Sequence, residues 1–236
     1  MNFENKTVVV TGVGRAGQVG EAVAAAFAHA GAALVLVDRD PVQVQARAAA
    51  LVAHHGRAVG HACDLTDAAA VLALAAQVGE AFGGAIDALV NVAGGFAMSG
   101  PVADADVAVL RRQLDLNLVT AFNSSRAFLP LLRPRGGSVV YFAAAAVLPG
   151  GSVAEKSGYA AAKAGVLALM RAVAEEEHDR DVRANAVAPT NIRTGDNVAA
   201  MGDGLRYVER ETVADTVVWL CSEAARAITG QVVQLG

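Results

Sequence analysis

The feature that most constrains the fold is a regular alternation of short β-branched runs with longer alanine-rich segments along the whole chain. The runs that predict strands cover residues 6–12, 32–38, 57–64, 86–94, 137–143, 182–189 and 231–236. The segments that predict helices cover residues 19–30, 41–55, 67–82, 105–132, 156–178 and 212–224. Several strands are apolar on both faces, as buried parallel strands are. The pattern predicts an α/β fold, a Rossmann-type doubly wound parallel sheet of about seven strands flanked by helices.

Composition indicates a single domain over residues 1–236. Apolar residues make up 54% of the chain, enough for a large core, and no linker, repeat or low-complexity block divides it. The net charge of −4, with scattered basic residues, does not indicate a nucleic-acid partner. The N-terminus lacks a signal-peptide pattern, and charges interrupt every long apolar run. We therefore expect a soluble, cytoplasmic protein with no nucleic-acid or membrane partner.

Cysteine and histidine residues form no recognisable disulfide or metal motif. Cys63 and Cys221 lie far apart and make no Cys-x-x-Cys pair, which indicates reduced thiols. His54, His55 and His61 lack a grouping with carboxylates, so a metal site is not expected.

A glycine-rich turn, "TGVGRAGQVG", follows the first predicted strand. It contains Gly12, Gly14, Gly17 and Gly20 and opens a helix at Val19. Glycines let the backbone turn tightly and let amide groups and the helix N-terminus approach a pyrophosphate. Because the turn lies between a strand and a helix, it predicts a dinucleotide-binding site.

The residues after the second strand bear on the choice of dinucleotide. Asp38 lies about twenty residues beyond the turn, where an acid accepts both ribose hydroxyls of NAD and repels the 2′-phosphate of NADP. Alternatively, Asp38 only begins the turn "DRDP". Arg15 and Arg39 could instead favour a phosphate. NAD is the predicted cofactor, with NADP possible.

Tyr159 and Lys163 form a candidate pair for proton transfer. In "YAAAK" they are four residues apart, so on a helix they face the same way. An ammonium group near the phenol, together with a positive nicotinamide, is expected to lower the tyrosine pKa. Tyr159 would then give a proton to a carbonyl or take one from an alcohol. The alternative is an exposed tyrosine and lysine on a surface helix.

Together these motifs, with others in order along the whole chain, resemble the short-chain dehydrogenase/reductase family. The other segments are "CDLTD", "NVAGG", "LDLNLVTAF" and "NAVAPTNIRT". The resemblance implies Asn117, Tyr159 and Lys163 as catalytic residues, and Lys163 also as a ligand of the nicotinamide ribose. It implies further dinucleotide contacts from Asp64, Leu65, Asn91, Ala93, Gly94, Pro189, Thr190, Ile192 and Thr194. At Thr190 this chain departs from the family, which has a glycine there.

The alanine run after the fifth predicted strand is the main departure from the family. Ala144 takes the place of the family's catalytic serine, and no serine or threonine occurs between Ser138 and Ser152. Loss of one oxyanion-type donor typically lowers the rate by about 10²–10³. Ser152 could supply the missing hydroxyl, although "PGGS" reads as a turn.

Three functions remain open on the sequence. The first is an NAD(H)-dependent oxidoreductase acting on a small carbonyl, alcohol or activated ring. The second is reduction of a quinonoid ring with NADH, because the alanine run and "VAGGFA" resemble dihydropteridine reductases. The third is a non-catalytic NAD-binding protein, which the missing serine allows.

Other segments bear on substrate and assembly. Phe96, Met98 and residues 197–204 are expected to line the mouth of the site, and the short lid between Thr194 and Thr212 indicates a small or flat substrate. Residues 105–132 and 156–178 carry more apolar and small side chains than one buried face requires. We expect them to pair in a homodimer or homotetramer.

Overall fold

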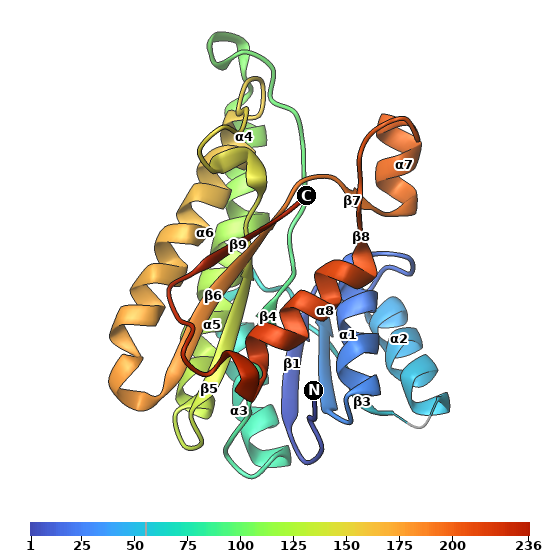
Figure 1. Cartoon of the computed structure of the whole chain (residues 1–236), viewed down its shortest axis with the longest axis vertical. Helices are drawn as coiled ribbons and strands as arrows, with labels where there is room; N and C mark the ends of the chain where they lie inside the picture. The colour runs from blue at the N-terminus through green and yellow to red at the C-terminus, as the bar shows by residue number, and fades with distance from the viewer. Residues whose placement is uncertain (55) are drawn as a thin grey trace.

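The structure, a computed structural model, describes residues 1–54 and 56–236 and has a parallel sheet between two layers of helices (Figure 1). The sheet has seven strands in the order β3-β2-β1-β4-β5-β6-β9. Its strands are β1 (Thr7–Thr11), β2 (Ala33–Asp38), β3 (Arg57–Ala62), β4 (Ala88–Asn91), β5 (Gly137–Phe142), β6 (Val182–Pro189) and β9 (Val232–Leu235). The predicted fold class is confirmed. The strand order reverses between β1 and β4, which is where ligands bind in such sheets.

The two helical layers bury opposite faces of the sheet. The main helices are α1 (Val19–His29), α2 (Pro41–Ala53), α3 (Ala68–Ala81), α4 (Val107–Leu114), α5 (Thr120–Leu132), α6 (Ser157–Glu176) and α8 (Arg210–Cys221). One core contains Val9 with residues of α3, α5 and α6, and the other contains Val8 and Val10 with residues of α1, α2 and α8. Because successive strand residues point to opposite faces, an unbroken apolar strand serves both cores.

Acidic residues cap the starts of three of these helices, α2, α3 and α4. Asp40 accepts hydrogen bonds from the amides of Val42 and Gln43, both at 3.0 Å, and Pro41 occupies the first helical position of α2. Asp67 caps α3 in the same way. The helix predicted over residues 41–55 ends at Ala53, and its predicted last residue, His55, lies outside the described residues.

The prediction of one uninterrupted helix over residues 105–132 is wrong in the middle of that range. A π-helical segment, Asp115–Val119, lies between α4 and α5. Wide turns of this kind occur frequently at functional sites, and this one contains Asn117. A hydrophobic period does not reveal one extra residue in a turn, so the sequence predicted an uninterrupted helix.

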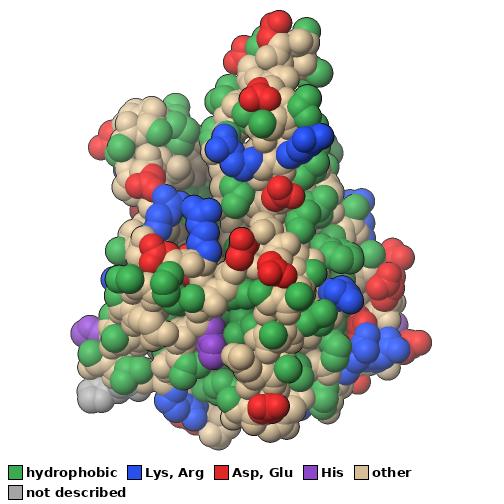
Figure 2. Space-filling model, turned by 180° about the vertical axis from the view of Figure 1, so that it is seen from behind, with side chains coloured by type: hydrophobic (Ala, Val, Ile, Leu, Met, Phe, Trp, Pro, Cys, Tyr) green, Lys and Arg blue, Asp and Glu red, His purple; other side chains and the backbone are tan. Residues whose placement is uncertain are grey.

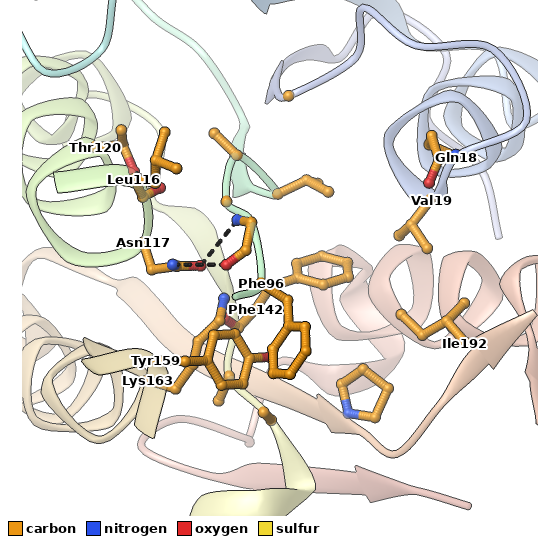
Figure 3. Close-up of a pocket in the computed structure, with 18 of the residues that line it drawn as sticks. Gln18, Val19, Phe96, Leu116, Asn117, Thr120, Phe142, Tyr159, Lys163 and Ile192 are labelled. Atoms are coloured by element: carbon orange, nitrogen blue, oxygen red, sulfur yellow. Dashed lines mark hydrogen bonds between the residues drawn. The ribbon is translucent and has the colours of Figure 1, made fainter. Parts of the chain in front are cut away.

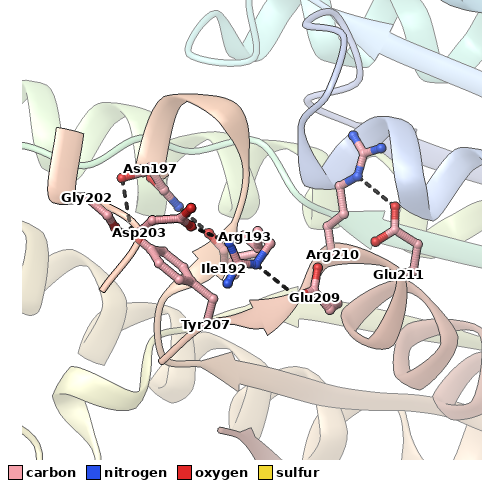
Figure 4. Close-up of polar contacts among 9 residues, drawn as sticks. All are labelled: Ile192, Arg193, Asn197, Gly202, Asp203, Tyr207, Glu209, Arg210 and Glu211. Carbon is pink, nitrogen blue, oxygen red and sulfur yellow. Dashed lines mark hydrogen bonds and ion pairs between the residues drawn. The ribbon is translucent and has the colours of Figure 1, made fainter. Parts of the chain in front are cut away.

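The segment between β6 and α8 folds into a small unit that the sequence analysis described only as a short lid. It comprises β7 (Ile192–Arg193), α7 (Gly195–Met201) and β8 (Val208–Glu209), with β7 and β8 paired in parallel. This lid, residues 192–209, stands apart from the main sheet (Figure 1). Arg193 bonds Asp203 at 2.7 Å and Glu209 at 2.9 Å, and the Tyr207 hydroxyl donates to the Gly202 carbonyl at 2.6 Å (Figure 4).

Candidate active site

A cleft of about 1800 Å³ opens at the carboxyl ends of the strands, between the lid and the helices α4, α5 and α6. Figure 2 shows the groove that separates these two parts of the surface. A pocket for one drug-sized ligand has about 300–1,000 Å³, so this cleft has room for a dinucleotide and a small substrate together.

Most of the predicted site residues line this cleft. Those that do are Gly12, Arg15, Val19, Gly20, Asp38, Arg39, Asp64, Leu65, Ala93, Gly94, Asn117, Tyr159, Lys163, Pro189, Thr190, Ile192 and Thr194. Gly14, Gly17 and Asn91 are not among the lining residues. Phe96 and Met98, expected at the mouth, line it as well.

The glycine-rich turn leaves the start of α1 facing the cleft. Gly12 has a φ of 73°, and a Cβ on Gly20 would overlap the Gly12 carbonyl oxygen. Gln18, the residue before α1, lines the cleft and makes no capping hydrogen bond with its side chain. The start of α1 therefore presents its partial positive charge to the cleft, which suits a pyrophosphate.

Asp38 is held at the end of β2 by the same turn. Its carboxylate accepts a hydrogen bond from the Gly14 amide at 2.8 Å, so Gly14 supports Asp38 rather than lining the cleft. Arg15 reaches across the mouth to the lid and pairs with Asp196 at 2.7 Å. Arg39 lines the cleft beside Asp38.

The next two predicted residues along the sheet differ in position. Asp64 accepts hydrogen bonds from the Thr66 hydroxyl at 2.7 Å and the Thr66 amide at 2.9 Å, which lower the pKa of Asp64 and keep it ionised. Asn91 lies behind the cleft, where its side-chain amide donates to the Ser125 hydroxyl at 3.4 Å. Asn91 is therefore part of the interior rather than of the cleft wall.

Asn117 holds the loop that follows β4. Its side-chain nitrogen donates to the Gly95 carbonyl at 2.9 Å and to the Gln113 carbonyl at 3.0 Å, and its oxygen accepts from the Gly95 amide at 3.2 Å. The π-helical segment thus joins the loop 94–96 to the end of α4 (Figure 3).

Tyr159 and Lys163 lie on the cleft face of α6, opposite Val19 and Ile192 (Figure 3). The Lys163 ammonium nitrogen is 5.8 Å from the centre of the Tyr159 ring and donates to the Phe142 carbonyl at 2.7 Å. The ring of Phe96 packs edge-on against Tyr159, with centres 5.0 Å apart.

Burial shifts the pKa values of both members of this pair. Burial raises the pKa of Tyr159 to about 12 and lowers the pKa of Lys163 to about 8. Desolvation disfavours the phenolate in the protein alone, so the expected lowering of the tyrosine pKa, which includes the charge of a bound nicotinamide, stays a prediction. Both shifts favour the neutral forms, so Tyr159 carries its proton at neutral pH.

The alanine run forms the wall beside this pair. Ala143, Ala144, Ala145 and Ala146 all line the cleft, and Ala144 is buried. No hydroxyl group projects from this stretch. Ser152 also lines the cleft and is exposed.

One wall of the cleft, formed by α4 and the residues after it, was predicted from the sequence only at Asn117. Ala108, Arg112, Leu116 and Thr120 line it at intervals of four residues, joined there by Arg111. Residues four apart on a helix share a face, so counting back from Thr120 in steps of four would have predicted that these residues lie together. Lys156, just before α6, was also missed.

Neither a cluster of three potential metal ligands nor a helix long and apolar enough to cross a bilayer occurs in the parts of the chain that the structure covers.

Comparison with known proteins identifies the family. A family model described as enoyl-(acyl carrier protein) reductase matches residues 12–235. The chain is 36% identical over 247 residues to a hexahydro-indene-carboxyl-CoA reductase of Mycobacterium tuberculosis, covering 99% of this chain and 92% of the relative. It is 32% identical over 240 residues to D-threitol dehydrogenase of Mycolicibacterium smegmatis, covering 97% and 90%.

The solved structures agree. A short-chain dehydrogenase/reductase structure from Burkholderia xenovorans has a TM-score of 0.88 and 33% identity, covering 99% of this chain and 95% of that one. The cleft, its tyrosine–lysine pair and these relatives lead to one conclusion. The chain belongs to the short-chain dehydrogenase/reductase family of oxidoreductases.

Proposed function

We propose that the protein is an NAD(H)-dependent oxidoreductase that interconverts a small carbonyl compound and its alcohol. The observation that carries the proposal is the convergence of Tyr159 and Lys163 with Asp38 and the glycine-rich turn on one cleft. A protein that only bound the dinucleotide would need the turn and Asp38, but not the pair on α6. The comparisons do not favour the sensor or the quinonoid-ring reductase.

The residues present fit a nicotinamide dinucleotide. The uncapped start of α1 suits its pyrophosphate, and Asp38 suits the adenosine ribose diol. Since Asp38 repels a 2′-phosphate, we propose NAD rather than NADP. The bound cofactor would supply or accept the hydride.

Tyr159 would handle the proton. Its hydroxyl is neutral at pH 7 because burial raises its pKa to about 12, so it can donate to the oxygen of a reduced carbonyl. Lys163 would bind the nicotinamide ribose, and a charged Lys163 would stabilise the phenolate that remains when Tyr159 donates its proton. Asn117 acts by holding the loop 94–96.

The wall at Ala144 has a consequence for the substrate. Without a hydroxyl there, a ketone lacks one donor at its oxygen, which typically costs about 10²–10³ in rate. Either Ser152 supplies the donor or the substrate is reactive enough without it. Ala144→Ser should raise kcat/KM for simple ketones, because a new donor acts where negative charge develops.

The experiment combines binding and turnover. Calorimetry should show NADH binding at least tenfold more tightly than NADPH, with the preference reduced in Asp38→Asn. Oxidation of NADH should be followed with ketones and quinones for wild type, Ala144→Ser and Ser152→Ala. Equal or tighter NADPH binding would overturn the NAD assignment. No turnover by wild type and by Ala144→Ser would overturn the enzyme assignment.

We also propose a homodimer or homotetramer. Val107 and Leu110 of α4 and Phe122 of α5 are 57%, 38% and 51% exposed, which leaves an apolar face on these helices. An isologous contact between two copies would bury it. Sedimentation should show a dimer or larger species at micromolar concentration, and a monomer would contradict this.

A further inference from the structure

Three basic side chains on one wall of the cleft lack a counter-charge. Arg111 and Arg112 are exposed and Lys156 is half-buried, and all three line the cleft. None of them forms an ion pair within residues 1–54 and 56–236. Arg15, across the cleft, is by contrast neutralised by Asp196.

These three residues belong to α4 and to the residue before α6, and the two helices touch. A Cβ on Gly158 would lie 3.1 Å from the Cα of Leu110, so the backbones meet there. Arg111 and Arg112 follow Leu110 directly, and Lys156 precedes Gly158 by two residues. Figure 2 shows basic side chains on both sides of the groove between the lid and the taller part of the molecule. Asp115 is the one acidic residue that α4 and the π-helical segment contribute to the lining.

The cofactor does not account for this charge. The start of α1 would bind the cofactor's pyrophosphate. It belongs to the opposite wall, as Figure 3 shows for Gln18 and Val19. Lys156 instead belongs to the α6 side, three residues before Tyr159. Phe96 and Met98, which are 58% and 52% exposed, also line the cleft, and Phe96 packs against the Tyr159 ring. Apolar side chains therefore line the cleft beside the reacting hydroxyl.

We propose that Arg111, Arg112 and Lys156 bind an anionic group of the substrate, a carboxylate or phosphate separated from the reacting carbonyl by an apolar stretch. This rests on the proposed function. Guanidinium groups bind such anions through paired hydrogen bonds, and unpaired cations at a cleft attract them from solution. The substrate is then a keto acid or an acyl compound on a phosphorylated carrier, rather than a neutral ketone.

The test uses two matched pairs of ketones that differ in the anion. Levulinate and methyl levulinate differ by a carboxylate, while S-acetoacetyl-4′-phosphopantetheine and S-acetoacetyl-pantetheine differ by one phosphate. We expect wild type to prefer the charged member of at least one pair by tenfold or more in kcat/KM, mainly through KM. Which pair shows the preference identifies the source of the anion. The preference should shrink as salt is raised.

Variants assign that preference to the wall. Arg112→Ala and Lys156→Ala should each reduce the ratio of charged to neutral kcat/KM at least threefold. Arg226→Ala removes one charge from a residue outside the cleft lining, which is 74% exposed on its side chain, and should leave the ratio and activity unchanged. A ratio near one in wild type for both pairs overturns the inference. The inference is also overturned if neither Arg112→Ala nor Lys156→Ala changes the ratio of charged to neutral kcat/KM. It is overturned as well if these variants weaken NADH binding instead of changing that ratio.

Binding separates failure of the inference from failure of the proposed function. If wild type turns over none of the four ketones, binding is measured instead. 4′-Phosphopantetheine and pantetheine form one pair of ligands, levulinate and methyl levulinate the other, and each ligand is titrated into the NADH-loaded protein. Tighter binding of a charged member, lost in Arg112→Ala, supports the anion site alone. Equal affinities within both pairs overturn it.

Discussion

The two sides of the cleft are held by different forces. On one side, α6 and the π-helical segment carry Tyr159, Lys163 and Asn117, whose neighbours are backbone carbonyls and a packed core. On the other side, the lid is held by Arg193 with Asp203 and Glu209, whose side chains are 40%, 77% and 56% exposed. Exposed ion pairs contribute little, whereas burial of apolar surface contributes most of the stability.

This contrast assigns different tasks to the two sides. Proton transfer needs Tyr159 in one place, and a buried helix provides that. A ligand must enter and leave, and a segment with few buried contacts opens at low cost in free energy. We therefore expect the α6 side to stay fixed while the lid opens and closes.

The largest effect should come from a hydroxyl on the fixed side. Tyr159→Phe removes the proton donor and should lower kcat by about 10²–10⁴ while NADH still binds. Tyr207→Phe is the matched control, because it removes a lid hydroxyl that bonds the Gly202 carbonyl at 2.6 Å. The control should change kcat by less than about threefold. Equal losses in both variants would remove the distinction between the two sides.

The same contrast explains what the sequence predicted. Seven strands and the position of the glycine-rich turn follow from local patterns of apolar residues and glycine, and so does the shared face of Tyr159 and Lys163. The pairing of β7 with β8 does not, because each has two residues and the pairing spans Ile192 to Val208. Its contacts are exposed ion pairs, which leave no periodic signal.

The positions of individual side chains are also only partly predictable from the sequence. Asn91 and Gly14 belong to motifs, yet Asn91 turned out to lie in the interior and Gly14 to support Asp38. The partner of Arg15 lies 181 residues away, and no local rule links it to Asp196. Spacing identifies which residues share a face, but tertiary contacts decide which of them reach the cleft.

The second prediction concerns the buried charge on the fixed side. Burial lowers the pKa of Lys163 from 10.5 to about 8, so between these values the unfolded chain binds more protons than the folded protein. The free energy of unfolding should therefore rise with pH in that window for wild type relative to Lys163→Met, by about 3 kcal/mol in all. Urea unfolding of the cofactor-free protein from pH 7 to 10 measures it. A parallel pH dependence of the two proteins would mean that Lys163 is solvated.

A third prediction tests a buried ion pair at the far end of the same helices. Arg133 bonds Glu177 at 2.7 and 2.9 Å, and these bonds lower the pKa of Glu177, whose side chain is 3% exposed. Glu177→Gln should reduce the free energy of unfolding by about 1–3 kcal/mol. A lowered pKa makes this contribution complete above about pH 4.3 and removes it as pH falls further.

The control for that measurement is in the lid. Glu209→Gln breaks an exposed bond to Arg193 and should leave the denaturation midpoint unchanged within error. If the lid variant were the more destabilising of the two, the assignment of stability to the buried side would be wrong.

The smallest effect is expected where the two kinds of structure meet, at the pair between Arg15 of the glycine-rich turn and Asp196 of α7. The two side chains are 65% and 60% exposed, so the pair contributes less than about 1 kcal/mol and Asp196→Asn should increase lid opening less than about fivefold. Hydrogen exchange reports this through the amides of Val198 and Gly202, which bond Thr194 and Val198 inside α7. Salt screens exposed charges, so wild type in 1 M salt should exchange like the variant, while amides of α6 should respond to neither change.

If α7 exchange stayed as slow in the variant and in salt as in wild type, burial rather than charge would hold the lid. It would then resemble the fixed side, and product release would require a larger motion than the opening of one exposed pair.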